Sequence, residues 1–137
     1  MERALTVRRR AAALAAATGL LVLAWSAWLG WFGGALFSDV PATAAPRQPI
    51  TAIILSGDLG FKIGMGPKIA ARLAARGIPV IGVNSLTFFN RPRSAAETAR
   101  LLEAAMARAT RLNGAGPVAL IGQSFGADML QFGLRLG

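Results

Sequence analysis

The motif Gly-Gln-Ser-Phe-Gly at residues 122–126 contains the residue types in this chain that are best suited to chemistry. It follows an apolar run, residues 116–121, and precedes a stretch compatible with a helix. A serine between two glycines at a strand-to-helix turn is typical of the nucleophile elbow of an α/β-hydrolase, because the glycines allow a sharp turn that exposes the hydroxyl. The motif therefore predicts Ser124 as a nucleophile. The alternative is a tight glycine-flanked turn without chemistry.

A serine nucleophile of this kind needs a base. In α/β-hydrolases a histidine, which follows an Asp or Glu in the chain, activates the serine hydroxyl. The sequence contains no histidine and ends shortly after Ser124. We therefore expect the front part of a hydrolase that is inactive alone, whose catalytic acid and histidine lie in a missing C-terminal half. A translated gene fragment is a further alternative.

Composition excludes several other classes of site. The 137 residues contain no cysteine and no histidine, so thiolate catalysis, disulfides and a transition-metal site are not expected. The glycine-rich segment 60–68 lacks the Gly-Lys-Ser/Thr of a phosphate-binding loop, and we expect no cofactor. The net charge of +9 comes from scattered arginines, which indicate a solvated surface and no nucleic-acid partner.

The N-terminal third predicts a membrane anchor. Residues 1–10 carry four arginines, and residues 11–37 carry no charge. As a helix this run would extend over roughly 40 Å, more than the ~30 Å of bilayer hydrocarbon. The positive-inside rule places residues 1–10 in the cytoplasm and the rest of the chain across the membrane, so that the chain crosses the membrane once. Residues 38–49, with three prolines, are expected to be a linker.

A cleaved export signal is the alternative to this anchor. Ala-Thr-Ala at residues 42–44 resembles a small-residue cleavage site, and the Arg8-Arg9 pair permits a twin-arginine signal. The chain would then be a free exported protein.

Residues 50–137 predict an incomplete α/β domain. Buried strands are expected at residues 50–55, 78–83 and 117–121, and helices at 67–76, from the capping box Ser94 to Glu97 through Leu112, and at 128–136. This alternation predicts a parallel sheet with helices on both faces, a three-layer α/β-hydrolase-like fold with both sheet edges open.

Three loops of such a sheet meet at the carboxyl ends of its strands, where ligands bind. They are residues 56–61, residues 84–89 and the elbow. In an elbow hydrolase the oxyanion hole uses the backbone N–H of the residue after the nucleophile, here Phe125, and an N–H from the earlier loop.

Three segments together carry a resemblance to a known family. Leu-Ser-Gly-Asp at 55–58, Gly-Ile-Pro-Val-Ile-Gly-Val-Asn-Ser-Leu at 77–86 and Gly-Gln-Ser-Phe-Gly-Ala-Asp at 122–128 resemble the bacterial virulence protein VirJ/AcvB family. The resemblance implies an α/β-hydrolase-like domain at the periplasmic face of the inner membrane. It implies hydrolysis of aminoacyl-phosphatidylglycerol, an anionic or aminoacylated phospholipid partner, and in VirJ-like members a link to type IV secretion proteins.

The resemblance also assigns residues. Ser124 maps onto the nucleophile and Asp58 onto the acidic position of the first loop. Asp128 matches the pattern as well, although its place in the first turn of a helix equally predicts a role at the helix N-terminus. Residues 59–61 depart from the family's Gly-Gly-Trp at this loop. The alternative to a hydrolase is a non-catalytic periplasmic binding module linked to virulence or secretion.

Overall fold

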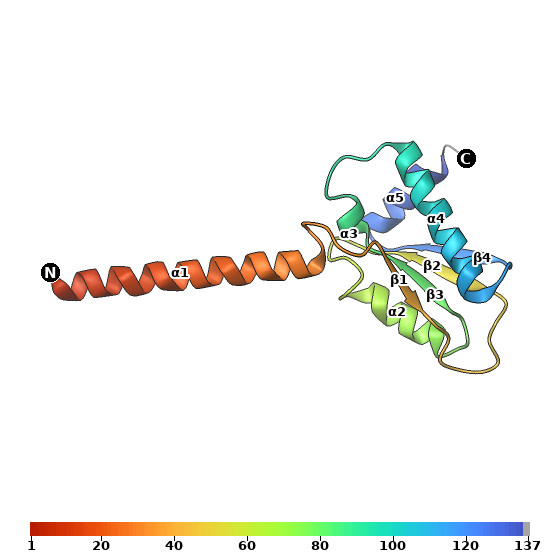
Figure 1. Cartoon of the computed structure of the whole chain (residues 1–137), viewed down its shortest axis with the longest axis horizontal. Helices are drawn as coiled ribbons and strands as arrows, with labels where there is room; N and C mark the ends of the chain where they lie inside the picture. Colours follow the sequence, from red (N-terminus) through yellow and green to blue (C-terminus); the bar gives the residue numbers. More distant parts are fainter. Residues whose placement is uncertain (136–137) are drawn as a thin grey trace.

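The computed structural model describes residues 1–135 and shows a long helix that extends from a small α/β domain (Figure 1). Helix α1, Glu2–Leu29, is almost entirely exposed, and Gly30 ends it in the left-handed conformation. It is long and apolar enough to cross a membrane. A membrane anchor and a signal sequence both have these properties.

A mixed sheet forms the centre of the domain. Strands β2 (Thr51–Leu55), β3 (Val80–Val83) and β4 (Val118–Gly122) run parallel, and β1 (Phe37–Val40) pairs antiparallel with β3. The order across residues 1–135 is β1-β3-β2-β4. Strand β2 is central and fully buried, as a continuous apolar run in a parallel sheet should be.

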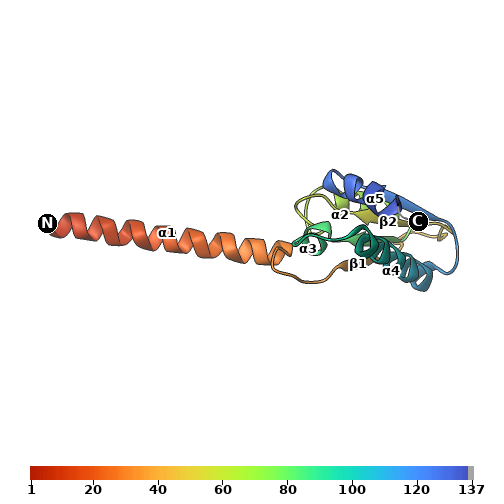
Figure 2. The same ribbon diagram turned by 90° about the horizontal axis from the view of Figure 1, so that it is seen from above.

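Helices cover both faces of the sheet. Side chains alternate along β2, so that Ile53 and Leu55 pack with α4 (Ala95–Asn113), whereas Ala52 and Ile54 pack on the side of α2 (Met65–Ala74). Helix α5 (Phe125–Leu134) lies beside α4, and the short α3 (Ser85–Phe88) follows β3. Figure 2 shows that α1 points away from this layered domain. The predicted capping box is confirmed, since Ser94 and Glu97 satisfy each other's backbone N–H at the start of α4.

Strand β1 corrects the expectation of a purely parallel sheet with two open edges. Its residues lie partly in the predicted linker 38–49, and the strand covers the free edge of β3. The carboxylate of Asp39 accepts two hydrogen bonds of 3.0 Å from the guanidinium of Arg108 on α4. The helix itself ends at Leu29, eight residues before the end of the uncharged run 11–37 from which the anchor was predicted. The last predicted helix reaches Leu136, which lies outside the described residues.

Candidate functional site

The carboxyl ends of the three parallel strands lie side by side. Leu55 of β2 is in register with Val83 of β3 and with Gly122 of β4, so the loops after these strands start at one edge of the sheet. Two hydrogen bonds connect these loops. The N–H of Gln123 donates to the carbonyl of Leu55 at 3.0 Å, and the N–H of Ser85 donates to the hydroxyl of Ser56 at 2.9 Å.

Ser124 occupies a backbone conformation that L-residues rarely adopt, with φ 51° and ψ −123°. Among residues 1–135 it is the one non-glycine residue with positive φ. The turn also requires both flanking glycines, because a Cβ on Gly122 would clash with the backbone of Ala127, and a Cβ on Gly126 with the carbonyl of Leu55. A sharp turn of this kind presents the Ser124 side chain to solvent.

Helix α5 begins directly after this turn. The N–H of Gly126 donates to the carbonyl of Gln123, and that of Ala127 to the carbonyl of Ser124. Phe125 is the first residue of the helix, where an N–H has no partner within the helix and the helix dipole is positive. Its N–H is therefore placed to stabilise a negative charge that develops next to Ser124.

The first loop closes over the other side of Ser124. A Cβ on Gly57 would lie 3.5 Å from the Cβ of Ser124, so the loop backbone approaches the serine closely. Between them lies a cavity of about 230 Å³, lined by the first loop and the elbow, namely Gly57, Asp58, Leu59, Gly60, Ile63, Gly64, Gln123 and Ser124. A small substrate group could occupy this cavity next to the serine hydroxyl.

The two acidic residues singled out from the sequence have different surroundings. Asp58 lines the Ser124 cavity and also a second cavity of about 390 Å³. Asp128 lies in the first turn of α5, is exposed, and lines a separate depression with Met129 and Arg135. The structure thus brings Asp58, and not Asp128, to the cavity of Ser124.

No described residue completes a metal site or a serine–histidine pair. The sequence contains no histidine, and no group of three or more potential metal ligands exists within residues 1–135.

Within residues 1–135 the pKa of one carboxyl, that of Glu97 at the start of α4, is displaced. The backbone N–H of Ser94 holds the pKa of Glu97 below its ordinary value, and Arg91 and Arg93 act in the same direction.

A residue that follows the end of α1 belongs to the same region, which the sequence did not suggest. Trp31 lines the second cavity together with Asp58, Leu86, Phe89, Asn90 and Phe125. Helix α3 was also missed. Its signal was Asn84, whose side-chain oxygen accepts a hydrogen bond from the N–H of Thr87 as a helix N-cap does.

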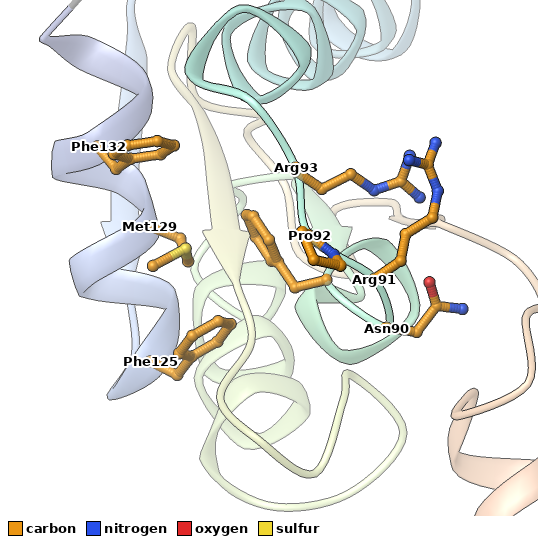
Figure 3. A pocket seen from close by; sticks show the side chains of 8 residues that line it. Asn90, Arg91, Pro92, Arg93, Phe125, Met129 and Phe132 are labelled. Atoms are coloured by element: carbon orange, nitrogen blue, oxygen red, sulfur yellow. The ribbon is translucent and has the colours of Figure 1, made fainter.

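An apolar groove extends from Phe125 along α5. Figure 3 shows Phe125, Met129 and Phe132 on one side of this helix, facing the segment Asn90 to Arg93. The groove measures about 460 Å³, and the rings of Phe89 and Phe125 meet edge to face at 5.4 Å. Phe125, the residue after Ser124, therefore lines both of the larger hollows, whereas Ser124 lines the small cavity.

Comparison with known proteins identifies the family. The model of the bacterial virulence protein (VirJ) family matches residues 49–136, which is well over half of the chain and includes both the first loop and the elbow. The chain belongs to the VirJ family. Neither the comparison with curated proteins nor that with solved structures gave a match. As a VirJ protein the chain is related to bacterial virulence, and its recognition from three short motifs is confirmed.

Proposed function

We propose that this VirJ chain carries the nucleophile and oxyanion half of a serine ester hydrolase, in an α/β-hydrolase-like domain that α1 anchors at the periplasmic face of the inner membrane. The observation that carries the proposal is the strained backbone of Ser124 between two glycines that sterically cannot be replaced. Structures keep such strain when the surroundings demand it, and it is concentrated at functional sites.

The sheet order supports the α/β-hydrolase-like assignment. An elbow hydrolase takes one oxyanion donor from the residue after the nucleophile and the other from an earlier strand-to-helix loop. Here β4, which precedes the elbow, pairs with β2, which precedes the loop at Gly57. The two loops therefore face each other across the cavity that holds Ser124.

In the proposed reaction the hydroxyl oxygen of Ser124 attacks the carbonyl carbon of an ester. The carbonyl oxygen becomes an oxyanion held by the N–H of Phe125 and an N–H of the first loop. Its collapse breaks the ester C–O bond, the alcohol leaves with the proton that the serine gave up, and water then hydrolyses the acyl-serine. The serine proton needs an acceptor. Asp58 is a candidate because it lines the same cavity. A histidine would be the usual acceptor, and it has to come from outside these 137 residues.

Loss of the histidine from a serine triad lowers the rate by about 10⁶-fold, so the chain alone should show no esterase activity above background. Added imidazole can enter the small cavity and accept the proton. We expect imidazole to stimulate the hydrolysis of p-nitrophenyl acetate by the full chain in detergent. Ser124→Ala should abolish the protein-dependent part, and Ser38→Ala, at an exposed serine on β1, should not. If imidazole stimulates the hydrolysis of p-nitrophenyl acetate equally for the unchanged chain, Ser124→Ala and Ser38→Ala, the proposal is refuted.

A second candidate is a non-catalytic binding module. The absence of histidine and the apolar groove beside Phe125, Met129 and Phe132 favour it, because exposed apolar grooves bind partner chains. The partners proposed from the family resemblance are secretion-system proteins, and for the hydrolase an anionic or aminoacylated phospholipid. If Ser124→Ala has the same esterase activity as the unchanged chain in every assay, with imidazole present, the binding module is favoured.

The proposed topology rests on the four arginines that precede an uncharged apolar helix. A reporter enzyme that works only in the periplasm should be active when it is fused after Gly137. Activity of a reporter that works only in the cytoplasm would overturn the topology. Release of the domain from membranes by carbonate would instead favour the cleaved periplasmic form.

A further inference from the structure

The end of α1 is docked into the domain rather than joined to it by a free linker. The side-chain amide of Asn84 donates to the carbonyl of Leu29 at 3.2 Å, and the hydroxyl of Thr87 donates to the carbonyl of Gly30 at 3.0 Å. Leu29 is only 3% exposed, whereas nearly all other residues of α1 are not covered by the domain. The bond from Asn84 satisfies a carbonyl that the end of a helix otherwise leaves without a partner, and the bond from Thr87 adds to the one that the N–H of Gly33 donates to Gly30.

The first loop holds the helix end from another direction. The ammonium of Lys62 donates to the carbonyl of Trp28 and lies 5.0 Å from the centre of its ring. A Cβ on Gly60 would approach the carbonyl of Leu29 at 3.0 Å, so the loop backbone packs directly against the helix end. The same loop forms the wall of the Ser124 cavity.

The charge pattern of α1 places this junction at a membrane surface. Arg10 is the last charged residue before the domain, and residues 11–29 form the uncharged part of the helix. At about 1.5 Å per residue these residues span about 28 Å, which matches the ~30 Å of bilayer hydrocarbon. The hydrocarbon therefore ends near Leu29. Trp28 and Trp31 lie at this level, where tryptophan is enriched in membrane proteins.

From this position of α1 in the bilayer we propose that the junction holds the carboxyl edge of the sheet against the outer surface of the bilayer that α1 spans. The Ser124 site then opens at the lipid–water interface. Three exposed apolar side chains near the helix end would enter the interface, namely Trp31, Phe32 and Leu59. Lys62 beside them would face anionic headgroups. The proposal rests on the membrane anchoring proposed above, and not on the chemistry of Ser124.

The docking also explains how the anchor contributes to the site. Trp31 forms one wall of the cavity that adjoins Asp58 and Phe125. Cleavage at Ala42 to Ala44 would remove this wall and strand β1 with it. The proposal therefore requires the uncleaved chain.

The absence of cysteine makes a direct depth measurement possible. A nitroxide attached to Leu59→Cys would report on the proposed interface, and one on Met106→Cys would report on the exposed face of α4. The two positions are matched in exposure, 52% and 48%. The full chain is reconstituted into vesicles of phosphatidylethanolamine and phosphatidylglycerol, and the accessibility of each label to oxygen and to a water-soluble nickel chelate is measured.

We expect the ratio of oxygen to nickel accessibility to be several-fold higher for Leu59→Cys than for Met106→Cys. Equal, water-like ratios at the two positions would overturn the docking proposal. Carbonate extraction of the same vesicles tests the anchoring separately. If carbonate leaves the chain in the membrane and both labels have water-like ratios, the docking proposal alone is refuted. If carbonate extracts the chain, both the anchoring and the docking are refuted.

Two glycines provide a matched pair of variants for the junction. Gly30 and Gly33 both have positive φ, 105° and 115°, so alanine strains the backbone at either position. A Cβ on Gly30 would collide with the side chain of Thr87, whereas one on Gly33 would meet nothing within 4 Å. In the Leu59→Cys background, Gly30→Ala should therefore lower the accessibility ratio toward that of water, and Gly33→Ala should not. Equal effects of the two variants would contradict the proposed role of the docked junction.

Discussion

Replacement of Ser124 by glycine should make the protein more stable, although it removes the proposed nucleophile. Ser124 has φ 51° and ψ −123°, a conformation that costs a residue with a Cβ about 1–3 kcal/mol. Glycine has no Cβ and adopts positive φ freely. The hydroxyl of Ser124 makes no capping hydrogen bond to α5, so its loss removes no capping interaction from the folded state.

The expected size of the effect follows from two opposing contributions. Relief of strain stabilises the folded chain by about 1–3 kcal/mol, and the greater freedom of glycine in the unfolded chain costs about 0.4–1 kcal/mol. The net gain for Ser124→Gly is about 1 kcal/mol. Ser124→Ala retains the Cβ and the strain, and should leave stability nearly unchanged. The two variants therefore separate the strain of the backbone from the loss of the hydroxyl.

Thermal unfolding of the full chain in detergent, followed by circular dichroism, measures the difference. A gain of about 1 kcal/mol raises the Tm of a domain of this size by roughly 4–8 °C. We expect Ser124→Gly to melt above Ser124→Ala and above the unchanged protein. If Ser124→Gly melts below Ser124→Ala, the elbow stores no strain and the reasoning about this turn is wrong.

The remaining predictions concern packing, capping and the sheet edge. Gly126→Ala should destabilise the domain by about 1–3 kcal/mol or more, because its Cβ would meet backbone carbonyls, whereas Gly57→Ala, whose nearest contact is 3.5 Å, should have little effect on the Tm. Ser94→Ala should cost about 1 kcal/mol in urea unfolding through loss of the α4 N-cap, and an unchanged midpoint would contradict this. The depressed pKa of Glu97 means that its ionised form stabilises the folded chain; this contribution is complete above the ordinary pKa of 4.5 and is lost as the pH falls below it, so Glu97→Gln should flatten the pH dependence of stability in acid. Asp39→Asn, which weakens a partly exposed ion pair with α4, should lower the free energy of unfolding in urea by at most about 1 kcal/mol.

The local features of the site could be predicted from the sequence. The glycines at residues 122 and 126 flank a serine after an apolar run, and the structure shows why both are needed there. The strands β2, β3 and β4 were foreseen because continuous β-branched runs are typical of parallel strands buried on both faces. The capping box at Ser94 and Glu97 was equally visible, since its two side chains are three residues apart.

Features that depend on contacts between distant residues could not be predicted in this way. Strand β1 has only four residues, and its pairing with β3 and the ion pair of Asp39 with Arg108 join segments about 40 to 70 residues apart. Apolar composition continues to Phe37, which concealed the end of α1. Gly30 was the available signal, because a glycine in the left-handed conformation commonly ends a helix.

The docking of α1 was also beyond sequence reasoning. Asn84 and Thr87 donate to carbonyls of Leu29 and Gly30, and a carbonyl that accepts a side-chain hydrogen bond has no signature in the sequence. The two acidic residues differ in this respect. The sequence placed the loop of Asp58 at the same sheet edge as the elbow, and the fold shows that Asp58 lines the Ser124 cavity, whereas only the fold shows that Asp128 lines a separate depression.

Covalent labelling shows whether Ser124 is a nucleophile. A fluorophosphonate reacts with a serine by forming an oxygen–phosphorus bond and releasing fluoride. The full chain in detergent is treated with this reagent and imidazole, and the modified residues are located by tandem mass spectrometry. The account predicts that Ser124 is labelled well above the exposed serines Ser38 and Ser94. Labelling of Ser124 no greater than that of Ser38 and Ser94 would contradict it.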